Sequence, residues 1–466
     1  MERHQTMRGT LDWSYELCND TERAVFDRLS VFPAGFDLAA ARAIAARDSV
    51  SDLDVIDTVP QLVDRSLLQR STAADGTTRY RMLETMRAYA REHLQHSGIA
   101  DSVRECHARY MADLIGRLLL RSYGPDEQAV RRRQIEYFSD ALVALEWCID
   151  HREWDVALLL SYVGWGVAHR ESGEMCARLM DAALESGDDI DFIGVLEHMD
   201  VRRAPWESED VIDARGWAMV HSTDPIPHQY LSIPGHIVLS ASIVSYACGR
   251  ELVSSLDRYE DAPLTVKYLA MWGAARSLIM SGHLELADEL LGPLEEIVAE
   301  LDSESAAGTV AELRGHIGVW NLDWVEAAHW FAIAAQSHAH DRPNWFKLAV
   351  SWHSLTARTL AGYWLTGSEI ADPWRWLRAE SITVLVWHGA VSTALALDRL
   401  GYHDLAERLI RWARCSDPGG VMDRFLRILR LADLDIEPGD SDDDLETLID
   451  EVLIIADELD RHPGLV

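Results

Sequence analysis

Four arginines flank a short predicted hairpin in the first quarter of the chain. They are Arg65, Arg70, Arg79 and Arg81. Guanidinium groups bind phosphate oxygens in a two-pronged geometry, so a basic face around this hairpin could hold a nucleic-acid backbone. The helix predicted just before the hairpin opposes that chemistry, because aspartates outnumber arginine on it. Those aspartates are Asp52, Asp54, Asp57 and Asp64. We therefore rank DNA binding here as the weaker of two alternatives.

Tryptophans form a second set of candidate residues. The chain contains 17 of them, and a tryptophan offers a large amphipathic contact area that suits binding grooves. The candidate groove contacts are Trp324, Trp345 and Trp352. Filling of the core between large helices is the alternative. Because Trp320, Trp324 and Trp330 cannot all share one helical face, some of these rings are expected in the core and some on a concave surface.

Catalytic and metal-binding patterns are weak throughout the sequence. His329, His338 and His340 cluster loosely near Asp341, without two histidines at i and i+4 and a third ligand. The six cysteines are far apart, and no G-x-S-x-G nucleophile motif occurs. We therefore predict no catalytic residue, no metal site and no cofactor, and hence a protein that is not an enzyme.

Nucleotide hydrolysis through a phosphate-binding loop is excluded by the lysine content. Such a loop needs G-x-x-x-x-G-K-[ST], with a lysine that reaches the terminal phosphates. The only lysines are Lys267 and Lys347, and neither follows a glycine-rich loop. The sequence is not expected to bind ATP by that route.

The net charge of −34 over 466 residues is the strongest global feature. Residues 1–110 contribute only −3, so the remainder carries about −31. A surface this acidic repels phosphate backbones; it suits either a basic protein partner or simply a solvated acidic face. No apolar signal follows Met1, and no stretch nears the ~18 apolar residues of a membrane span, so we expect a cytoplasmic protein.

The first hundred residues predict a winged helix. The expected helices are Thr6–Cys18, one that carries Val25, Phe26 and Leu29, Leu38–Ala46, Leu53–Val63 and Glu84–Gln95, and the expected strands are Leu67–Arg70 and Thr78–Met82. Asn19 offers N-cap chemistry, and Asp75-Gly76 is the turn signal of the hairpin. Val31-Phe32 is long enough only for a bridging strand. Pro60 is expected to kink or break its helix.

The remainder predicts an irregular, tetratricopeptide-like α-solenoid of helix hairpins. In four segments a turn residue precedes an alanine expected to pack against the neighbouring helix. These alanines are Ala157, Ala287, Ala327 and Ala406. The last three are separated by 40 and 79 residues, which is close to one and two units of two helices. A terminal helix that carries Leu445, Leu448, Ile449, Val452 and Leu459 is expected to cap the last apolar seam.

These elements suggest four domains in a mainly α protein. They are a winged helix at 1–98, a first tetratricopeptide-like lobe at 99–187, an irregular proline-containing connector at 188–263, and a second lobe with an acidic capping helix at 264–466. Arg131-Arg132-Arg133 is the only dense basic run, and a solvated helix face is the expected role for it.

The motifs as a set resemble one family. They are the run from Arg3 into Leu11–Leu17, Leu29–Phe32 with Gly35-Phe36, Leu62–Leu67, Tyr80–Ala90 and Ala144–Trp147. This pattern is similar to the winged-helix and repeat segment of actinobacterial STAND-type ATPase transcriptional regulators, which are linked to LuxR, SARP or adenylate-cyclase domains. In that family an ATPase precedes the winged helix, and it is missing from this sequence. Pro33, Pro60 and Asp140 depart from the family pattern, with asparagine expected at position 140.

The resemblance implies a non-enzymatic relay and sensor that acts by protein or small-molecule binding in the groove of the repeats. The winged helix is then a relay between ATPase and repeats and does not read bases, and the partner is a protein such as a separately encoded ATPase or regulator. A decayed copy with little function left is an open alternative. The other is a DNA-binding winged-helix regulator whose repeats sense a ligand; it requires the basic face of Arg65, Arg70, Arg79 and Arg81.

Overall fold

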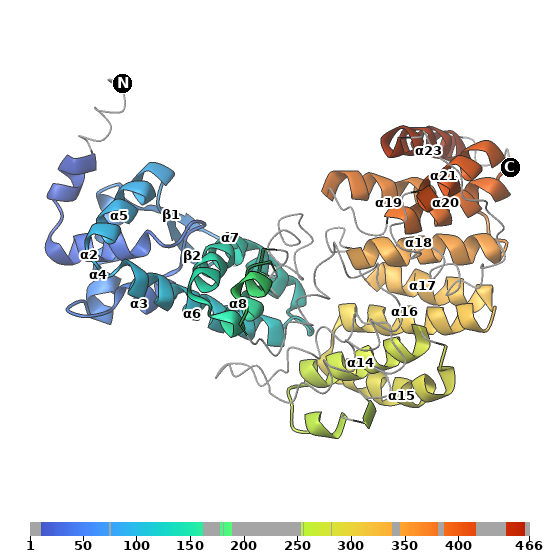
Figure 1. Cartoon of the computed structure of the whole chain (residues 1–466), viewed down its shortest axis with the longest axis horizontal. Helices are drawn as coiled ribbons and strands as arrows, with labels where there is room; N and C mark the ends of the chain where they lie inside the picture. The colour runs from blue at the N-terminus through green and yellow to red at the C-terminus, as the bar shows by residue number, and fades with distance from the viewer. Residues whose placement is uncertain are drawn as a thin grey trace. The chain divides into compact units, whose positions relative to one another are not determined.

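The computed structural model describes residues 11–73, 76–161, 178–179, 181–188, 253–254, 256–280, 282–337, 345–380, 386–415 and 444–461. The chain divides into two compact units (Figure 1). The first comprises Met1–Leu119 and Arg132–Val163, and the second comprises Leu120–Arg131 and Gly164–Val466. Among the described residues, no helix is long and apolar enough to cross a membrane.

The first unit begins with a winged helix, as predicted. Its elements are α2 (Asp20–Leu29), α3 (Leu38–Ala45), α4 (Asp52–Asp64), β1 (Gln69–Thr72), β2 (Thr78–Arg81) and α5 (Glu84–His96). Short polar side chains start the three leading helices: Asn19, Asp37 and Ser51 each accept a hydrogen bond from a backbone N–H in the first turn. The apolar faces of these helices meet in one core around Phe26, with residues such as Ile44 fully buried.

Two local predictions for this domain were wrong. Pro60 does not break its helix, because α4 continues through it to Asp64. The proline lies on the exposed face, where water can satisfy the carbonyl that loses its partner. The first strand begins at Gln69 instead of Leu67, since Leu67 and Leu68 both donate to the Leu62 carbonyl at the end of α4.

The bridging residue was also misplaced, because it is Phe36 and not Val31-Phe32. Phe36 and Tyr80 exchange two backbone hydrogen bonds of 2.8 Å. Gly35 makes this approach possible with a φ of +108°, and a Cβ there would lie 2.6 Å from the Tyr80 carbonyl oxygen. A glycine turn therefore ties the loop after α2 to the wing.

Three further helices belong wholly or partly to the first unit. They are α6 (Ala100–Leu120), α7 (Glu127–His151) and α8 (Trp154–Ser161). Val103 of α6 is part of the winged-helix core, and Cys106 and Tyr110 pack against that core. The first helix after the winged helix, α6, thus shares a core with it.

The second unit is a stack of helices, seen from α14 to α23 in Figure 1. They are α14 (Leu264–Met280), α15 (Leu284–Leu301), α16 (Glu304–Trp320), α17 (Trp324–Ser337), α18 (Trp345–Leu360), α19 (Gly367–Glu380), α20 (Val386–Arg399), α21 (His403–Cys415) and α23 (Leu445–Arg461), after a 3₁₀ turn η3 (Leu256–Tyr259). Helices adjacent in the chain pack together as hairpins, for example α16 with α17 and α20 with α21. Together with the winged helix, this repeat-like helical region confirms the predicted fold class.

The turn-and-alanine signature marks the starts of helices. Ala157, Ala287, Ala327 and Ala406 are all buried, each in the first turn of α8, α15, α17 or α21. One close approach joins α16 to α17, where a Cβ on Gly318 would lie 2.8 Å from the Ala327 nitrogen. Small residues therefore occupy the places where helix axes converge.

Helix α23 packs on α19 and α21, with Leu448, Ile449 and Val452 fully buried. Its acidic face is matched by arginines of those two helices, as in the pair Arg408–Glu451 at 2.8 Å. Most of the predicted connector at 188–263 lies outside the described residues, and the four domain limits stay a prediction.

Candidate functional site

The predicted basic face depends on the hairpin of β1 and β2. These strands are antiparallel, with Arg70 opposite Tyr80 and Gln69 opposite Arg81. Side chains alternate between the two faces of a strand. Arg79 and Arg81 therefore share one face, and Arg70 lies on the other. The hairpin does not bring all the candidate arginines to one surface.

Two of the four arginines are engaged within the first unit. Arg79 donates to the Tyr137 hydroxyl at 2.7 Å and to the Gly35 carbonyl at 3.1 Å, and its guanidinium lies 4.7 Å from the centre of the Tyr137 ring. Arg65 pairs with the buried carboxylate of Glu22 at 3.1 Å. Both guanidiniums thus tie segments of the unit together.

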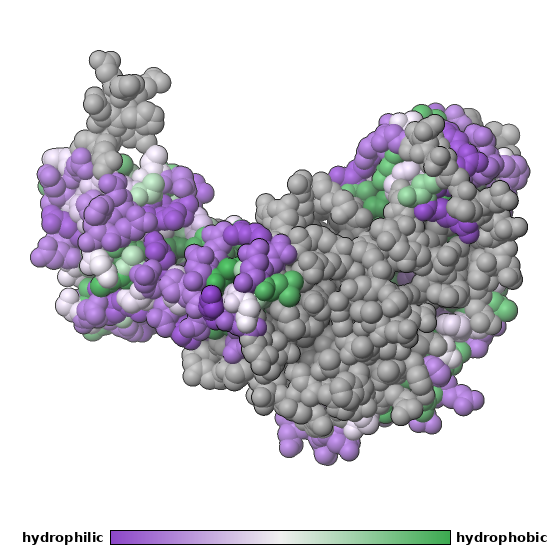
Figure 2. Space-filling model, viewed as in Figure 1, coloured by the Kyte–Doolittle hydropathy of each residue, from purple (hydrophilic) through white to green (hydrophobic). Residues whose placement is uncertain are grey.

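The other two arginines are exposed. Arg81 donates to the side-chain oxygen of Gln69 at 3.1 Å, and Arg70 has no ion pair among the residues that the structure describes. Helix α4, which precedes the wing, carries acidic residues in its first turn and no basic residue in its last. Figure 2 shows a mainly hydrophilic visible surface over the first unit, with small hydrophobic areas between.

Asp140, flagged by the sequence as a departure from asparagine, is fully buried in α7. Burial raises the pKa of its carboxyl group to about 8, and Arg79 and the Ala34 backbone offset this only in part. Neither carboxylate oxygen has a well-aligned hydrogen-bond partner within the described residues. An uncharged side chain would suit this position better.

The structure describes the side chains of two of the three candidate tryptophans. Trp352 of α18 is fully buried, and its ring centre lies 5.6 Å from that of Trp374. Trp324 is half-buried against the same core. The side chain of Trp345 lies outside the described set.

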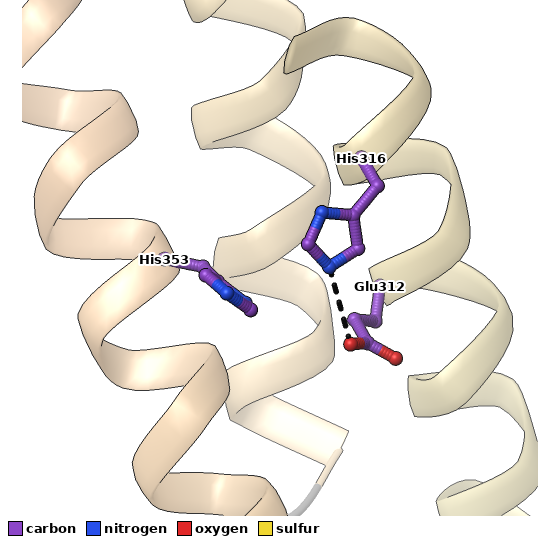
Figure 3. Close-up of side chains that lie close together, drawn as sticks. All are labelled: Glu312, His316 and His353. Carbon is purple, nitrogen blue, oxygen red and sulfur yellow. Dashed lines mark hydrogen bonds and ion pairs between the residues drawn. The ribbon is translucent and has the colours of Figure 1, made fainter. Parts of the chain in front are cut away.

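A cluster that the sequence did not reveal lies in the second unit. Glu312 and His316 extend from α16, and His353 faces them from α18 (Figure 3). Their nearest ligand atoms all lie within 4.8 Å of one another, and all three residues are buried. The Nε2 atom of His316 lies 3.3 Å from Glu312 Oε1. Two imidazoles and a carboxylate in this arrangement are a donor set for a divalent metal ion.

Aromatic rings surround the cluster. Phe331 of α17 packs edge-on against His316 with ring centres 5.2 Å apart, and His388 of α20 lies 4.6 Å from His353. Burial, and then neighbouring histidines, hold the pKa of His353 and of His388 well below the ordinary value. Both rings are therefore neutral near pH 7, which is the form that binds metals.

The histidines that the sequence pattern singled out lie elsewhere. His329 is exposed on α17, while His338, His340 and Asp341 lie outside the described residues. The one local signal for the cluster was the i, i+4 spacing of Glu312 and His316. His353 follows 37 residues later, so only the packing of α18 on its neighbours completes the set.

Comparisons with known proteins place the first unit in context. Residues 19–95 match the family described as winged helix-turn-helix domain. The chain is 37% identical over 177 residues to a protein named "Putative HTH-type transcriptional regulator" from Mycobacterium tuberculosis (strain ATCC 25618 / H37Rv), covering 37% of this chain and 20% of that protein. It is 38% identical over 111 residues to an uncharacterised protein of the same strain, covering 24% and 27% respectively.

The chain therefore spans about a fifth of the length of the regulators it matches. Among solved structures, it is similar to a Signal Transduction ATPase with Numerous Domains (STAND) protein with a tetratricopeptide repeat sensor from Pyrococcus horikoshii. That likeness has a TM-score of 0.40 and 13% identity, and it covers 89% of this chain and 52% of the other. A likeness this low supports no conclusion about function.

Proposed function

We propose that this chain is a non-enzymatic regulatory protein whose winged helix acts as a relay between protein partners and whose helical repeats bind a protein or small-molecule effector. The similarity of residues 19–95 to winged helix-turn-helix domains, and of a longer segment to proteins named as transcriptional regulators, supports the regulatory role. The relay role rests on the geometry of the wing.

The observation that carries the proposal is the engagement of Arg79. A wing that reads DNA presents its arginines to phosphates or bases. Arg79 instead donates hydrogen bonds to the Tyr137 hydroxyl of α7 and to the Gly35 carbonyl. The wing is thereby fastened to α7, a helix beyond the winged helix in the chain, which suits a domain that transmits movement along the chain.

Electrostatics supports the same function. The helix before the wing has Asp52 and Asp54 in its first turn, and the chain as a whole carries −34. Phosphate contacts supply most of the affinity of non-specific DNA binding. A partner protein with a basic surface fits this charge better than nucleic acid does.

We further propose that the partner supplies the nucleotide-hydrolysing step, as in STAND-type regulators. The sequence contains no phosphate-binding loop, and its lysines are Lys267 and Lys347. The repeats would then be the sensor half of a split or longer regulator.

Capture of the full chain from its native host after mild crosslinking tests the proposal, with both protein and DNA scored. We expect one stoichiometric protein that carries a G-x-x-x-x-G-K-[ST] loop, and no enrichment of DNA. A matched capture with Arg70→Glu/Arg81→Glu should recover the same protein. Salt-sensitive DNA that is lost in this variant, without a protein partner, would favour the DNA-binding alternative instead.

A further inference from the structure

We propose that Glu312, His316 and His353 form a buried binding site for a single divalent transition-metal ion, Zn²⁺ in preference, which fastens α16 to α18. The proposal is independent of the regulatory role and goes beyond it. No ligand set of this kind was expected from the sequence, and the site is built by packing of helices that are distant along the chain.

The donor atoms are suited to zinc in type and in number. Zinc in proteins takes imidazole nitrogen and carboxylate oxygen at about 2.0–2.2 Å, and a site with three protein ligands is completed by a water in the fourth position. Glu312 and His316 are four residues apart and so project from one face of α16. His353 completes the triangle from α18, with its ring centre 4.6 Å from that of His316.

The present separations need only side-chain adjustment to reach coordination. All three donor atoms lie within 4.8 Å of one another, whereas ligands of a tetrahedral zinc ion lie roughly 3.3 Å apart, given bonds of about 2 Å. Small rotations of the two rings and of the Glu312 side chain close that difference. The backbone of α16 and α18 can therefore remain in place.

The surroundings explain why such a site would be retained in a core. Burying a carboxylate and several imidazoles costs desolvation free energy, and a bound cation would offset part of that cost. Phe331 shields one side, and its ring fits against Gly315, where a Cβ would lie 2.6 Å from the ring. The positive charge of Arg276, which also acts on His353, opposes the binding of a cation at this site.

His388 of α20 is the neighbour that orients the third ligand. Its ring lies 4.6 Å from that of His353, with the two planes at 46°. We assign it a positioning role, because it lies outside the group of three ligands. Its replacement by glutamine should weaken zinc binding about tenfold, as is usual for groups that hold a ligand in place.

Metal binding to the intact chain, stripped with a chelator and then dialysed, tests the site. We expect one Zn²⁺ per chain at high affinity in competition with a chromogenic chelator. Glu312→Gln, His316→Gln and His353→Gln should each weaken it by about 100-fold or more. His329→Gln, on the exposed face of α17, is the matched control and should bind like the native chain.

A spectroscopic readout keeps the test decisive if a variant is unstable. Co²⁺ in the native chain should give the visible absorption of tetrahedral cobalt, and His353→Cys should add a thiolate-to-cobalt charge-transfer band. Absence of stoichiometric Zn²⁺ in the native chain would overturn the proposal. So would unchanged affinity in the three ligand variants, because the metal would then be held elsewhere.

Discussion

The two units use their candidate chemical groups in opposite ways. In the first unit the arginines that could face a ligand lie near the surface, yet Arg65 and Arg79 are engaged by a carboxylate, a hydroxyl and a carbonyl of the same unit. In the second unit the candidate groups lie in the core, where His316 and His353 meet Glu312. Residue type alone did not reveal which arginines of the first unit are engaged, and it did not predict the buried cluster of the second unit.

The physical origin of this difference is the depth of burial and not the range of the contacts. In the first unit Arg65 and Arg79 find partners 43 and 58 residues away in the chain, through contacts that are only partly buried. The repeats bury polar groups where hairpins stack, and these partners come from different repeats. In the first unit the polar side chains hold segments of the fold together, whereas in the second unit Glu312, His316 and His353 form one buried cluster.

The largest expected effect tests whether the tryptophans of the second unit are core or groove. Trp352→Ala should lower the free energy of unfolding of that unit by about 4 kcal/mol, because it empties a fully buried position against Trp374. Urea unfolding followed by circular dichroism measures it. Trp364→Ala, at an exposed position, is the control. A neutral Trp352→Ala would return this residue to the list of groove contacts.

The pH dependence of stability tests whether the buried carboxyl group of Asp140 is protonated in the folded first unit. Since burial raises the pKa to about 8, the folded state holds a proton that the unfolded state has lost above pH ~4. Stability then falls as the pH rises towards 8, by up to about 1.4 kcal/mol per pH unit.

Asp140→Asn should remove this contribution to the pH dependence. The variant should therefore become more stable relative to the native chain as the pH rises. Unfolding in urea at about pH 5 and about pH 8 compares the two proteins, and the difference between them isolates Asp140 from Asp27, whose pKa burial raises to about 7. An identical pH dependence in both proteins would show that Asp140 is ionised and well solvated in the folded state.

The arginine ties give a smaller effect. Arg79→Ala should cost about 2 kcal/mol of unfolding free energy in the first unit, the usual scale for hydrogen bonds of a charged donor. Arg70→Ala, on the opposite face of the wing, should change stability by less than about 0.5 kcal/mol. Equal stability of the two variants would mean that Arg79 is held no more firmly than Arg70.

The smallest expected change in stability comes from replacing Trp324, which is partly exposed. Trp324→Ala should destabilise the second unit by only about 1 kcal/mol, because the side chain is half-buried against the core. If the same change abolishes capture of the protein partner, Trp324 is a groove contact. If stability falls as far as in Trp352→Ala, the residue is an ordinary part of the core.

Local signals made much of this fold predictable from sequence. Asn19 caps α2 as expected, and the buried alanines from Ala157 to Ala406 open their helices where the turn pattern placed them. The predictions of the bridging residue and of the start of the first strand failed, because contacts with other segments of the chain determine both. Gly35 brings Phe36 to Tyr80, and Leu67 remains bonded to the end of α4.

The candidate sites were less predictable for the same reason. The four arginines were found by residue type, but whether each one is engaged depends on Glu22 and Tyr137, which lie 43 and 58 residues from their partners. The buried cluster spans α16 and α18, with His388 added from α20. Only the spacing of Glu312 and His316 was visible, and an i, i+4 pair of this kind is common on solvated helices.

We propose above all that the winged helix acts as a relay between proteins and does not read DNA. Fluorescence anisotropy of a short labelled duplex, titrated with the full chain at low and at physiological salt, tests it directly. We expect a Kd no tighter than about 100 µM, the weak end of non-specific binding, and no change in Arg70→Glu/Arg81→Glu. Tight, salt-dependent binding that this double variant abolishes would contradict it and make the wing a DNA-binding surface.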